Sequence, residues 1–201
     1  MSVAARALLA AAAIGIALGI ATQLLQGILP GPLNWIANAL SGWLLVAFLV
    51  GATMSRPQVA AAACVVMLLA ALAGYYATVQ LRFGYGAGSS ILIVWGLGAV
   101  AGGSVFGAAG WWWRHGEARA RAAAAGLLAA LFVAEGVYFL VTLPDPAVGA
   151  GAIVAGLVAP ALLGRTWRDR GLAYVAMVPG LALGALGYAA LLVLMRVVTG
   201  V

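Results

Sequence analysis

The sequence predicts an all-α, polytopic transmembrane helix bundle of seven spans, forming a single integral membrane domain over residues 1–201. Hydrophobic residues make up 66% of the chain and charged residues only 7%, whereas soluble domains carry about 25% charged residues on a surface that faces water. The mean hydropathy is +1.15. Apolar runs of about 20 residues, the length that crosses the roughly 30 Å hydrocarbon core, recur along the chain. The outer surface of such a bundle must face lipid.

The seven predicted spans are separated by short segments rich in proline, glycine or charge. The spans are residues 6–28, 35–54, 58–80, 90–113, 120–143, 147–163 and 172–197. The breaks between them fall at 30–32, 56–57, 82–90, 114–121, 144–146 and 165–170. Proline lacks a backbone donor and glycine lacks conformational restraint, so both interrupt helices. Span 147–163 is short and carries Pro160, and the bundle has six spans if this segment does not cross.

The arginines indicate which way the spans run, because cytoplasmic loops of membrane proteins carry an excess of basic residues. If the N-terminus is cytoplasmic, the outer segments hold only Arg82 and Arg196, and the cytoplasmic segments hold Arg6, Arg56, Arg114, Arg119, Arg121, Arg165, Arg168 and Arg170. The tryptophans at 111–113 and 167 adjoin cytoplasmic arginines and fit an interfacial aromatic belt. We therefore expect a multi-pass protein of the bacterial cytoplasmic (inner) membrane, with a cytoplasmic N-terminus and an uncleaved first span.

The sequence lacks the residues that several classes of function require. The net charge is +6, but the arginines occupy short gaps between apolar runs, so nucleic-acid binding is not expected. The single Cys64 cannot form an internal disulfide. The single His115 offers no pair of metal ligands, and the absence of lysine removes a Ser–Lys mechanism. We predict no metal site, no cofactor and no catalytic residue, which favours a protein that is not an enzyme.

Glycine pairs four residues apart place small residues on one helix face, where backbones can approach closely. Such pairs occur at Gly15 and Gly19, Gly98 and Gly102, Gly103 and Gly107, and Gly180 and Gly184. The span at 90–113 is the richest in glycine, so we expect it to lie centrally in the bundle. Its glycine face packs either against helices of the same chain or against a membrane partner or second copy in a homo-oligomer.

Polar side chains are costly in hydrocarbon, and here they gather in the outer half of the bundle. Glu135 is an ionisable residue about two turns from the outer end of its span, where a lone carboxylate is protonated or paired. We expect it to pair with Arg82 or Arg196, whose long side chains can reach inward. The predicted ligand-binding residues of this cluster are Gln26, Asn34, Trp35, Asn38, Tyr75, Tyr76, Gln80, Arg82, Glu135 and Tyr138.

This cluster predicts a membrane protein that binds or transports a small molecule in a polar and aromatic cavity on the extracytoplasmic side. A small polar or aromatic ligand fits these side chains, and membrane lipid surrounds the bundle. Two alternatives stay open. The same residues can serve only as interhelical hydrogen bonds in a non-catalytic scaffold or accessory subunit. The other alternative is a membrane-embedded enzyme that acts on lipid.

One part of the chain resembles a known family. The resemblance rests on the residues LLQG at 24–27 and PGPLNWIAN at 30–38, followed by Trp43. They are similar to those of small multispanning bacterial membrane proteins classed as a domain of unknown function. This resemblance extends over most of the chain and implies an integral membrane protein with no assigned activity. A second likeness, in architecture alone, is to the substrate-binding membrane subunits of energy-coupling-factor vitamin transporters, which bind on the outer side and typically have six helices.

Overall fold

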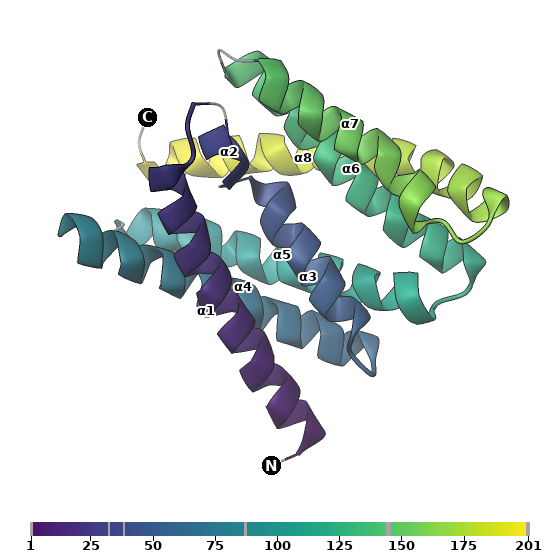
Figure 1. Cartoon of the computed structure of the whole chain (residues 1–201), viewed down its shortest axis with the longest axis horizontal. Coiled ribbons are helices and arrows are strands. Elements are labelled where there is room, and N and C mark those ends of the chain that lie inside the picture. Colours follow the sequence, from purple (N-terminus) through teal and green to yellow (C-terminus); the bar gives the residue numbers. More distant parts are fainter. Residues whose placement is uncertain (1, 32, 38, 87, 144–145, 200–201) are drawn as a thin grey trace.

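The computed structural model describes residues 2–31, 33–37, 39–86, 88–143 and 146–199. In these ranges the chain forms eight helices and no strand (Figure 1). The helices are α1 (Val3–Ile28), α2 (Leu33–Ala37), α3 (Leu40–Ala52), α4 (Pro57–Phe83), α5 (Ser89–His115), α6 (Ala118–Thr142), α7 (Pro146–Leu163) and α8 (Trp167–Thr199). Six of the described helices, all except α2 and α3, are long and apolar enough to cross a membrane. The predicted all-α, multi-pass bundle is confirmed.

Local signals in the sequence set where several helices begin and end. The Ser2 hydroxyl caps α1 by accepting a hydrogen bond from the backbone N–H of Ala5 at 3.2 Å. Pro57 is the first residue of α4, where its missing N–H would have had no helical partner. Gly84 ends α4 with φ of 75°, a left-handed conformation that glycine adopts without a steric penalty at Cβ.

The second predicted span, 35–54, is not one continuous helix. The structure divides this region between α2 and α3, with Ala39 in an extended conformation immediately before α3. The 13 residues of α3 cover about 20 Å at about 1.5 Å per residue, less than the roughly 30 Å of a hydrocarbon core. The segment predicted as 147–163 forms α7, which has 18 residues and is one of the six long apolar helices, so the shortest crossing element is α3 and not α7.

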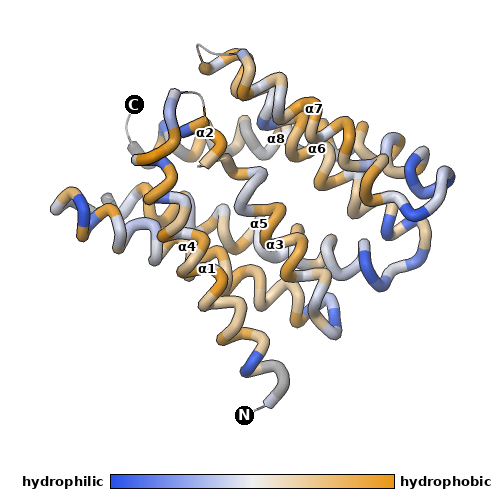
Figure 2. The backbone as a smooth tube through the Cα atoms, viewed as in Figure 1, coloured by the Kyte–Doolittle hydropathy of each residue, from blue (hydrophilic) through white to orange (hydrophobic). Residues whose placement is uncertain are grey.

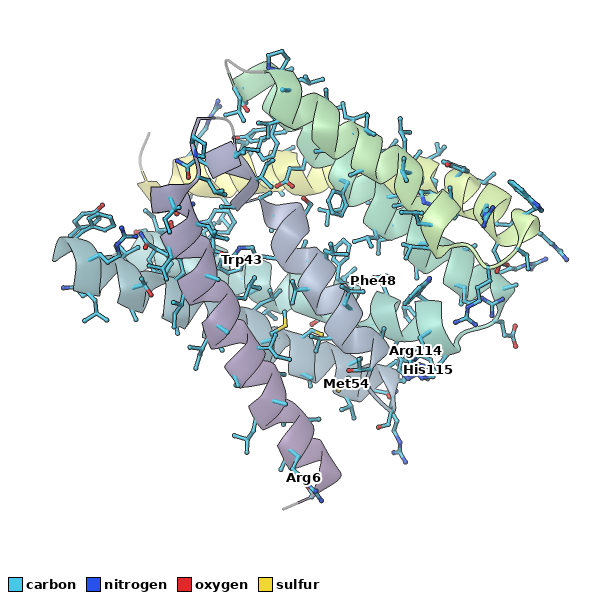
Figure 3. The ribbon with its side chains drawn as sticks, in the orientation of Figure 1. Arg6, Trp43, Phe48, Met54, Arg114 and His115 are labelled. Atoms are coloured by element: carbon cyan, nitrogen blue, oxygen red, sulfur yellow. The ribbon has the colours of Figure 1, made fainter. Side chains whose placement is uncertain are left out.

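Most hydrophilic residues lie near the two ends of the bundle (Figure 2). We call one end the Arg82 end; it holds the last turns of α1 and the connection between α4 and α5. We call the other end the arginine-rich end; it holds the connections α3–α4, α5–α6 and α7–α8. Met54, Arg114 and His115 mark the arginine-rich end in Figure 3. Between these ends the helix surfaces are mainly apolar, as a lipid environment requires.

Close packing through glycine joins α1 to α4. A Cβ atom at Gly15 would collide with the carbonyl oxygen of Met67, and one at Gly19 would collide with that of Ala71. Both contacts advance by four residues in the same direction, so α1 and α4 run parallel toward the Arg82 end. The absence of a side chain at the two glycines lets the helix backbones approach, which strengthens van der Waals packing where no hydrophobic drive exists.

The glycine-rich helix α5 contacts α3, α4, α6 and α8. A Cβ atom at Gly103 would lie 2.7 Å from the backbone nitrogen of Val65, and one at Gly110 would collide with the carbonyl oxygen of Phe48. These glycines therefore pack within the chain, against α4 and α3. Cβ positions at Gly96 and Gly98, by contrast, meet no atom within 4 Å. The predicted central position of the 90–113 span agrees with these contacts.

The main hydrophobic core cluster draws buried residues from α1, α3, α4, α5 and α6. Phe48, Cys64 and Met67 are completely buried, and Leu128 is 2% exposed. Phe48 occupies the middle of α3 (Figure 3). The Cys64 thiol donates a hydrogen bond to the carbonyl oxygen of Ala47 at 3.0 Å. This contact joins α4 to α3 inside the core and fits the structural role expected of a buried cysteine.

Polar contacts join the α5–α6 and α7–α8 connections at the arginine-rich end. Arg121 forms an ion pair with Asp169 at 3.4 Å, and Arg165 donates to the carbonyl oxygen of Arg114 at 2.9 Å. Trp113, one of the tryptophans predicted to lie in the interfacial belt, also makes contacts inside the bundle. Its ring centroid lies 5.6 Å from that of Phe48, and its indole N–H donates to the carbonyl oxygen of Leu163. Its neighbour Trp112 is 46% exposed, as an interfacial anchor would be.

Candidate functional site

An open cavity lies at the Arg82 end, between the last turns of α1 and α4 and the connection to α5. Its volume is about 490 Å³, within the range of about 300–1,000 Å³ typical of small-molecule sites. Polar and aromatic side chains form much of its wall. They are Gln23, Gln26, Tyr75, Tyr76, Arg82, Phe83 and Tyr85. We call this space the Arg82 cavity.

Two hydrogen bonds between α1 and α4 build the wall of the Arg82 cavity. The Tyr75 hydroxyl donates to Oε1 of Gln26 at 2.8 Å, and Nη1 of Arg82 donates to Oε1 of Gln23 at 2.9 Å. Gln23 and Gln26 are three residues apart, and Tyr75 and Arg82 are seven apart, so each pair shares one helix face. The two bonds cross, because the earlier glutamine on α1 pairs with the later residue on α4; together they hold the four side chains in place.

Arg82 brings a positive charge to this cavity. It forms no ion pair with any residue that the structure describes. A guanidinium has five N–H donors, and among the described residues that of Arg82 donates hydrogen bonds only to Gln23. Its carbon Cζ lies 5.2 Å from the ring centroid of Phe83, within cation–π range. A Cβ atom at Gly27 would lie 3.1 Å from Nη2, so the glycine leaves room for the guanidinium.

A second cavity of about 370 Å³ lies beside the first and is mainly apolar. Leu40, Trp43 and Leu44 of α3, Leu68 and Leu72 of α4, Trp95 and Gly98 of α5, and Gly184 and Gly187 of α8 contribute to its wall. We call it the Trp43 cavity; Trp43 is labelled in Figure 3. The indole Nε1 of Trp43 is buried and donates to no described residue, so α3 retains an unused hydrogen-bond donor.

Tyr75 and Tyr76 line both cavities. The two rings meet edge to face, with centroids 5.2 Å apart. Tyr75 turns its hydroxyl toward Gln26, and its ring centroid lies 6.3 Å from that of Trp43. Edge contacts between aromatic rings contribute about 0.5–1.5 kcal/mol beyond area burial. The tyrosine pair therefore forms a shared wall with a polar side and an apolar side.

Glu135 takes a different position from the one its sequence predicts. It is 2% exposed on α6, and it lines neither cavity. Its Oε1 accepts a hydrogen bond from the backbone N–H of Leu40 at 2.6 Å, and its Oε2 accepts one from Ser41 at 3.0 Å. The predicted pairing with Arg82 is wrong, because Arg82 bonds to Gln23. Glu135 is instead the N-terminal cap of α3, supplied by another helix.

Among the other candidate residues that the structure describes with their side chains, Asn34, Gln80 and Tyr138 line neither cavity. Asn34 is exposed on α2. The side chain of Gln80 lies beside the α4–α5 connection, near Gly86. Tyr138 packs in a small cluster with Ala39, Phe139 and Val148. Trp35 lies on α2, and the structure describes no more of it than its backbone; Asn38 lies outside the described residues.

Some wall residues were not among the predicted ligand-binding residues. Gln23, Phe83 and Tyr85 line the Arg82 cavity, and Trp43 and Trp95 line the Trp43 cavity. Gln23 had a usable signal, because it lies three residues before Gln26 and therefore on the same face of α1. No local pattern identifies Trp43 as a cavity residue, because that depends on the packing of α3 against α4.

The comparisons with known proteins give a family but no activity. No curated protein and no solved structure significantly matches the chain. A family described as "Family of unknown function (DUF6518)" has a model that matches residues 1–194, which confirms the predicted resemblance to an uncharacterised family. Because that match covers almost the whole sequence, the chain belongs to DUF6518, a family of unknown function.

Proposed function

We propose that this protein binds a small molecule carrying an anionic group in the Arg82 cavity. The observation that supports the proposal most directly is a guanidinium that lines an open cavity and forms no ion pair with a described residue. Arginine suits this task because its planar fork donates two parallel hydrogen bonds to a carboxylate or phosphate. The Gln23 bond holds one edge of the fork and leaves the others for a ligand.

The neighbouring side chains favour a ligand that also has an apolar or aromatic portion. Tyr75 and Tyr76 present ring surface to the cavity, and the Phe83 and Tyr85 rings stack with centroids 5.8 Å apart. Binding pockets commonly combine such apolar walls with a few placed polar groups that fix orientation. The bonds of Gln23 and Gln26 to α4 keep the wall ordered before a ligand arrives, which lowers the entropic cost of binding.

The Arg82 cavity opens on the outer side of the membrane under this proposal. Seven of the ten arginines lie in or beside the connections of the arginine-rich end, and Arg6 lies in the first turns of α1; the exceptions are Arg82 and Arg196. Basic residues are retained on the cytoplasmic side, so the arginine-rich end is the cytoplasmic one. The ligand then reaches the protein from outside the cytoplasm.

The experiment is a thermal-stability screen of the purified protein in lipid nanodiscs. The compounds are small carboxylates and phosphate esters, each tested on the wild type, Arg82→Gln and Arg196→Gln. Ligands that bind only the folded state raise its melting temperature. We expect at least one anion to stabilise the wild type and Arg196→Gln but not Arg82→Gln. Arg196 is the matched control because it is exposed on α8 and lines neither cavity.

Two results would overturn the proposed function. The first is a wild-type melting temperature that no anion in a broad panel changes. The second is stabilisation that persists unchanged in Arg82→Gln, because the binding site would then lie elsewhere.

Transport of the same ligand is a second candidate function. The interrupted α2–α3 region favours it, because transporters often build their sites from discontinuous helices whose halves can move separately. Proteoliposomes that accumulate the stabilising anion, with accumulation lost in Arg82→Gln, would support transport. Binding without accumulation across any imposed ion gradient would leave the protein a binding protein only.

A further inference from the structure

We infer that the Arg82 cavity and the Trp43 cavity are two halves of one site, and that its ligand is a single-chain amphiphile with a compact oxyanion headgroup. The headgroup lies at Arg82 and the hydrocarbon chain lies along Trp43. This inference rests on the proposed function, since it takes the anion at Arg82 as given and adds the class of molecule that carries it.

The shared tyrosine wall is the first reason. Tyr75 and Tyr76 line both cavities, so the two spaces adjoin at this pair of side chains. Tyr75 is polar on one side, where its hydroxyl bonds to Gln26 at 2.8 Å, and apolar on the other, where its ring meets Trp43. A molecule that passes this wall changes from a polar to an apolar environment along its length.

The wall of the Trp43 cavity is the second reason. Leucines from α3 and α4 and the rings of Trp43 and Trp95 surround it, and no charged side chain is part of that wall. An ionised group there would lose its hydration without a partner, whereas a hydrocarbon chain loses nothing. A methylene takes about as much room as a liquid water molecule, about 30 Å³. The 370 Å³ of this cavity therefore holds a single chain of about twelve carbons.

The charge at the other end is the third reason. Arg82 forms no ion pair among the described residues and is exposed at the mouth of its cavity. A neutral amphiphile would leave that charge without a partner. An oxyanion accepts two of its N–H groups in a charge-assisted pair. Charge complementarity thus selects an anionic amphiphile, and the small apolar volume selects one chain rather than two.

The test measures binding in nanodiscs of phosphatidylcholine, which avoids single-chain detergents that would occupy the same space. The probes are inorganic phosphate, octyl phosphate, dodecyl phosphate and uncharged dodecanol. Moving one methylene from water to an apolar environment strengthens binding by up to about fourfold. Because the lipid takes up the same chains, binding is measured as the excess over empty nanodiscs of the same phosphatidylcholine. We expect dodecyl phosphate to bind at least about tenfold more tightly than octyl phosphate, and both more tightly than inorganic phosphate. Dodecanol should bind weakly.

Variants of α5 provide the matched pair. A Cβ atom at either Gly96 or Gly98 meets no atom within 4 Å, but only Gly98 lines the Trp43 cavity. Gly98→Leu therefore projects a side chain into the chain-binding space, and Gly96→Leu adds the same side chain outside it. Gly187→Leu obstructs the same cavity from α8, where added atoms also find open space. Melting temperatures near that of the wild type verify that the variants fold.

We expect Gly98→Leu and Gly187→Leu to weaken dodecyl phosphate at least about tenfold and leave inorganic phosphate unchanged, with Gly96→Leu behaving as the wild type. Arg82→Gln should weaken all the phosphates. If chain length and Gly98→Leu have no effect while Arg82→Gln still does, the two-part site is refuted and the proposed function survives. If dodecanol equals dodecyl phosphate, headgroup selection is refuted. If no phosphate binding depends on Arg82, both proposals fail together.

Discussion

Glu135 shows how one buried carboxylate can organise a membrane helix. The first N–H groups of any helix lack partners within it, and inside a membrane each unpaired group costs several kcal/mol. Ala39 precedes α3 and supplies no side-chain cap, so the Leu40 and Ser41 N–H groups depend on Glu135. A carboxylate at a helix N-terminus also interacts favourably with the positive end of the helix dipole. An intramembrane acid is often functional, but this one has a complete structural role.

We predict that Glu135→Gln destabilises the protein. A glutamine amide can accept one of the two bonds, but its NH₂ group would face a backbone N–H. Loss of a hydrogen bond to a charged group costs about 1.5–3 kcal/mol, so the melting temperature should fall. The control is Glu117→Gln, because Glu117 stands exposed at the start of α6 and makes no side-chain capping bond. Equal melting temperatures for the two variants would contradict the capping role.

Cys64 offers a second test at the level of one side chain. It is completely buried and its thiol bonds to Ala47, so we predict that a membrane-permeant maleimide does not label it in the folded protein. Labelling should appear once the protein is unfolded in hot detergent. Mass spectrometry of the intact chain measures both states. Rapid labelling of the native protein would show that the core between α3 and α4 opens readily.

At the scale of elements, the contact between α1 and α4 positions the Arg82 cavity. The glycines at positions 15 and 19 set how closely the two helices approach, and the bonds from Gln23 and Gln26 follow on the same helix. The cavity wall is therefore an extension of a helix–helix interface. A substitution near the middle of that interface that moves α1 away from α4 should therefore also displace the side chains of the cavity wall.

We predict that Gly19→Leu separates α1 from α4. The new side chain would meet the backbone of Ala71 and Tyr75, which cannot move aside, and overpacking of this kind costs about 1–3 kcal/mol or more. Thermal unfolding in nanodiscs measures the loss. Gly96→Leu serves as the comparison, because its Cβ position is open. If Gly19→Leu is as stable as Gly96→Leu, the two helices do not pack as described.

The short helix α3 is the element that departs most from a regular span. Its N-terminus starts inside the bundle, on Glu135, and its C-terminus reaches Met54 at the arginine-rich end (Figure 3). The backbone on its N-terminal side is non-helical, which is tolerated at membrane depth only when protein surrounds it. The Trp43 cavity lies beside this start of α3, so the interruption and the cavity belong to the same part of the molecule.

For the whole molecule, six of the described helices are long enough to cross a membrane, and α2 with the short α3 stands in the place of a second crossing between α1 and α4. We predict that the N-terminus and the C-terminus lie on opposite sides of the membrane. Green fluorescent protein, which fluoresces only in the cytoplasm, should be bright at the N-terminus and dark at the C-terminus. Alkaline phosphatase, active only outside, should show the reverse. Fluorescence from both termini would mean that α3 does not return the chain to the arginine-rich side.

Residue patterns were sufficient for part of the candidate site. The side chains of Gln26, Tyr75, Tyr76 and Arg82 gather in one cavity as the distribution of polar residues predicts, because their depth in each span can be counted along the chain. Glu135 was placed at the correct depth but given the wrong partner. The position of a residue along its helix can be counted from the sequence. The residue that it contacts depends on which helix packs against α6, and the sequence spacing does not reveal this.

Composition and periodicity by themselves determined that this chain is an all-α, multi-pass membrane protein and where nearly all its helices begin and end. These features follow from local rules: apolar length, proline, glycine and charge act on the segment that contains them. Only the tertiary structure decided that the second span breaks before α3, that Glu135 from α6 caps the break, and that two cavities meet at Tyr75 and Tyr76. Each of these results joins residues far apart in the sequence, and its energy arises only when the helices pack.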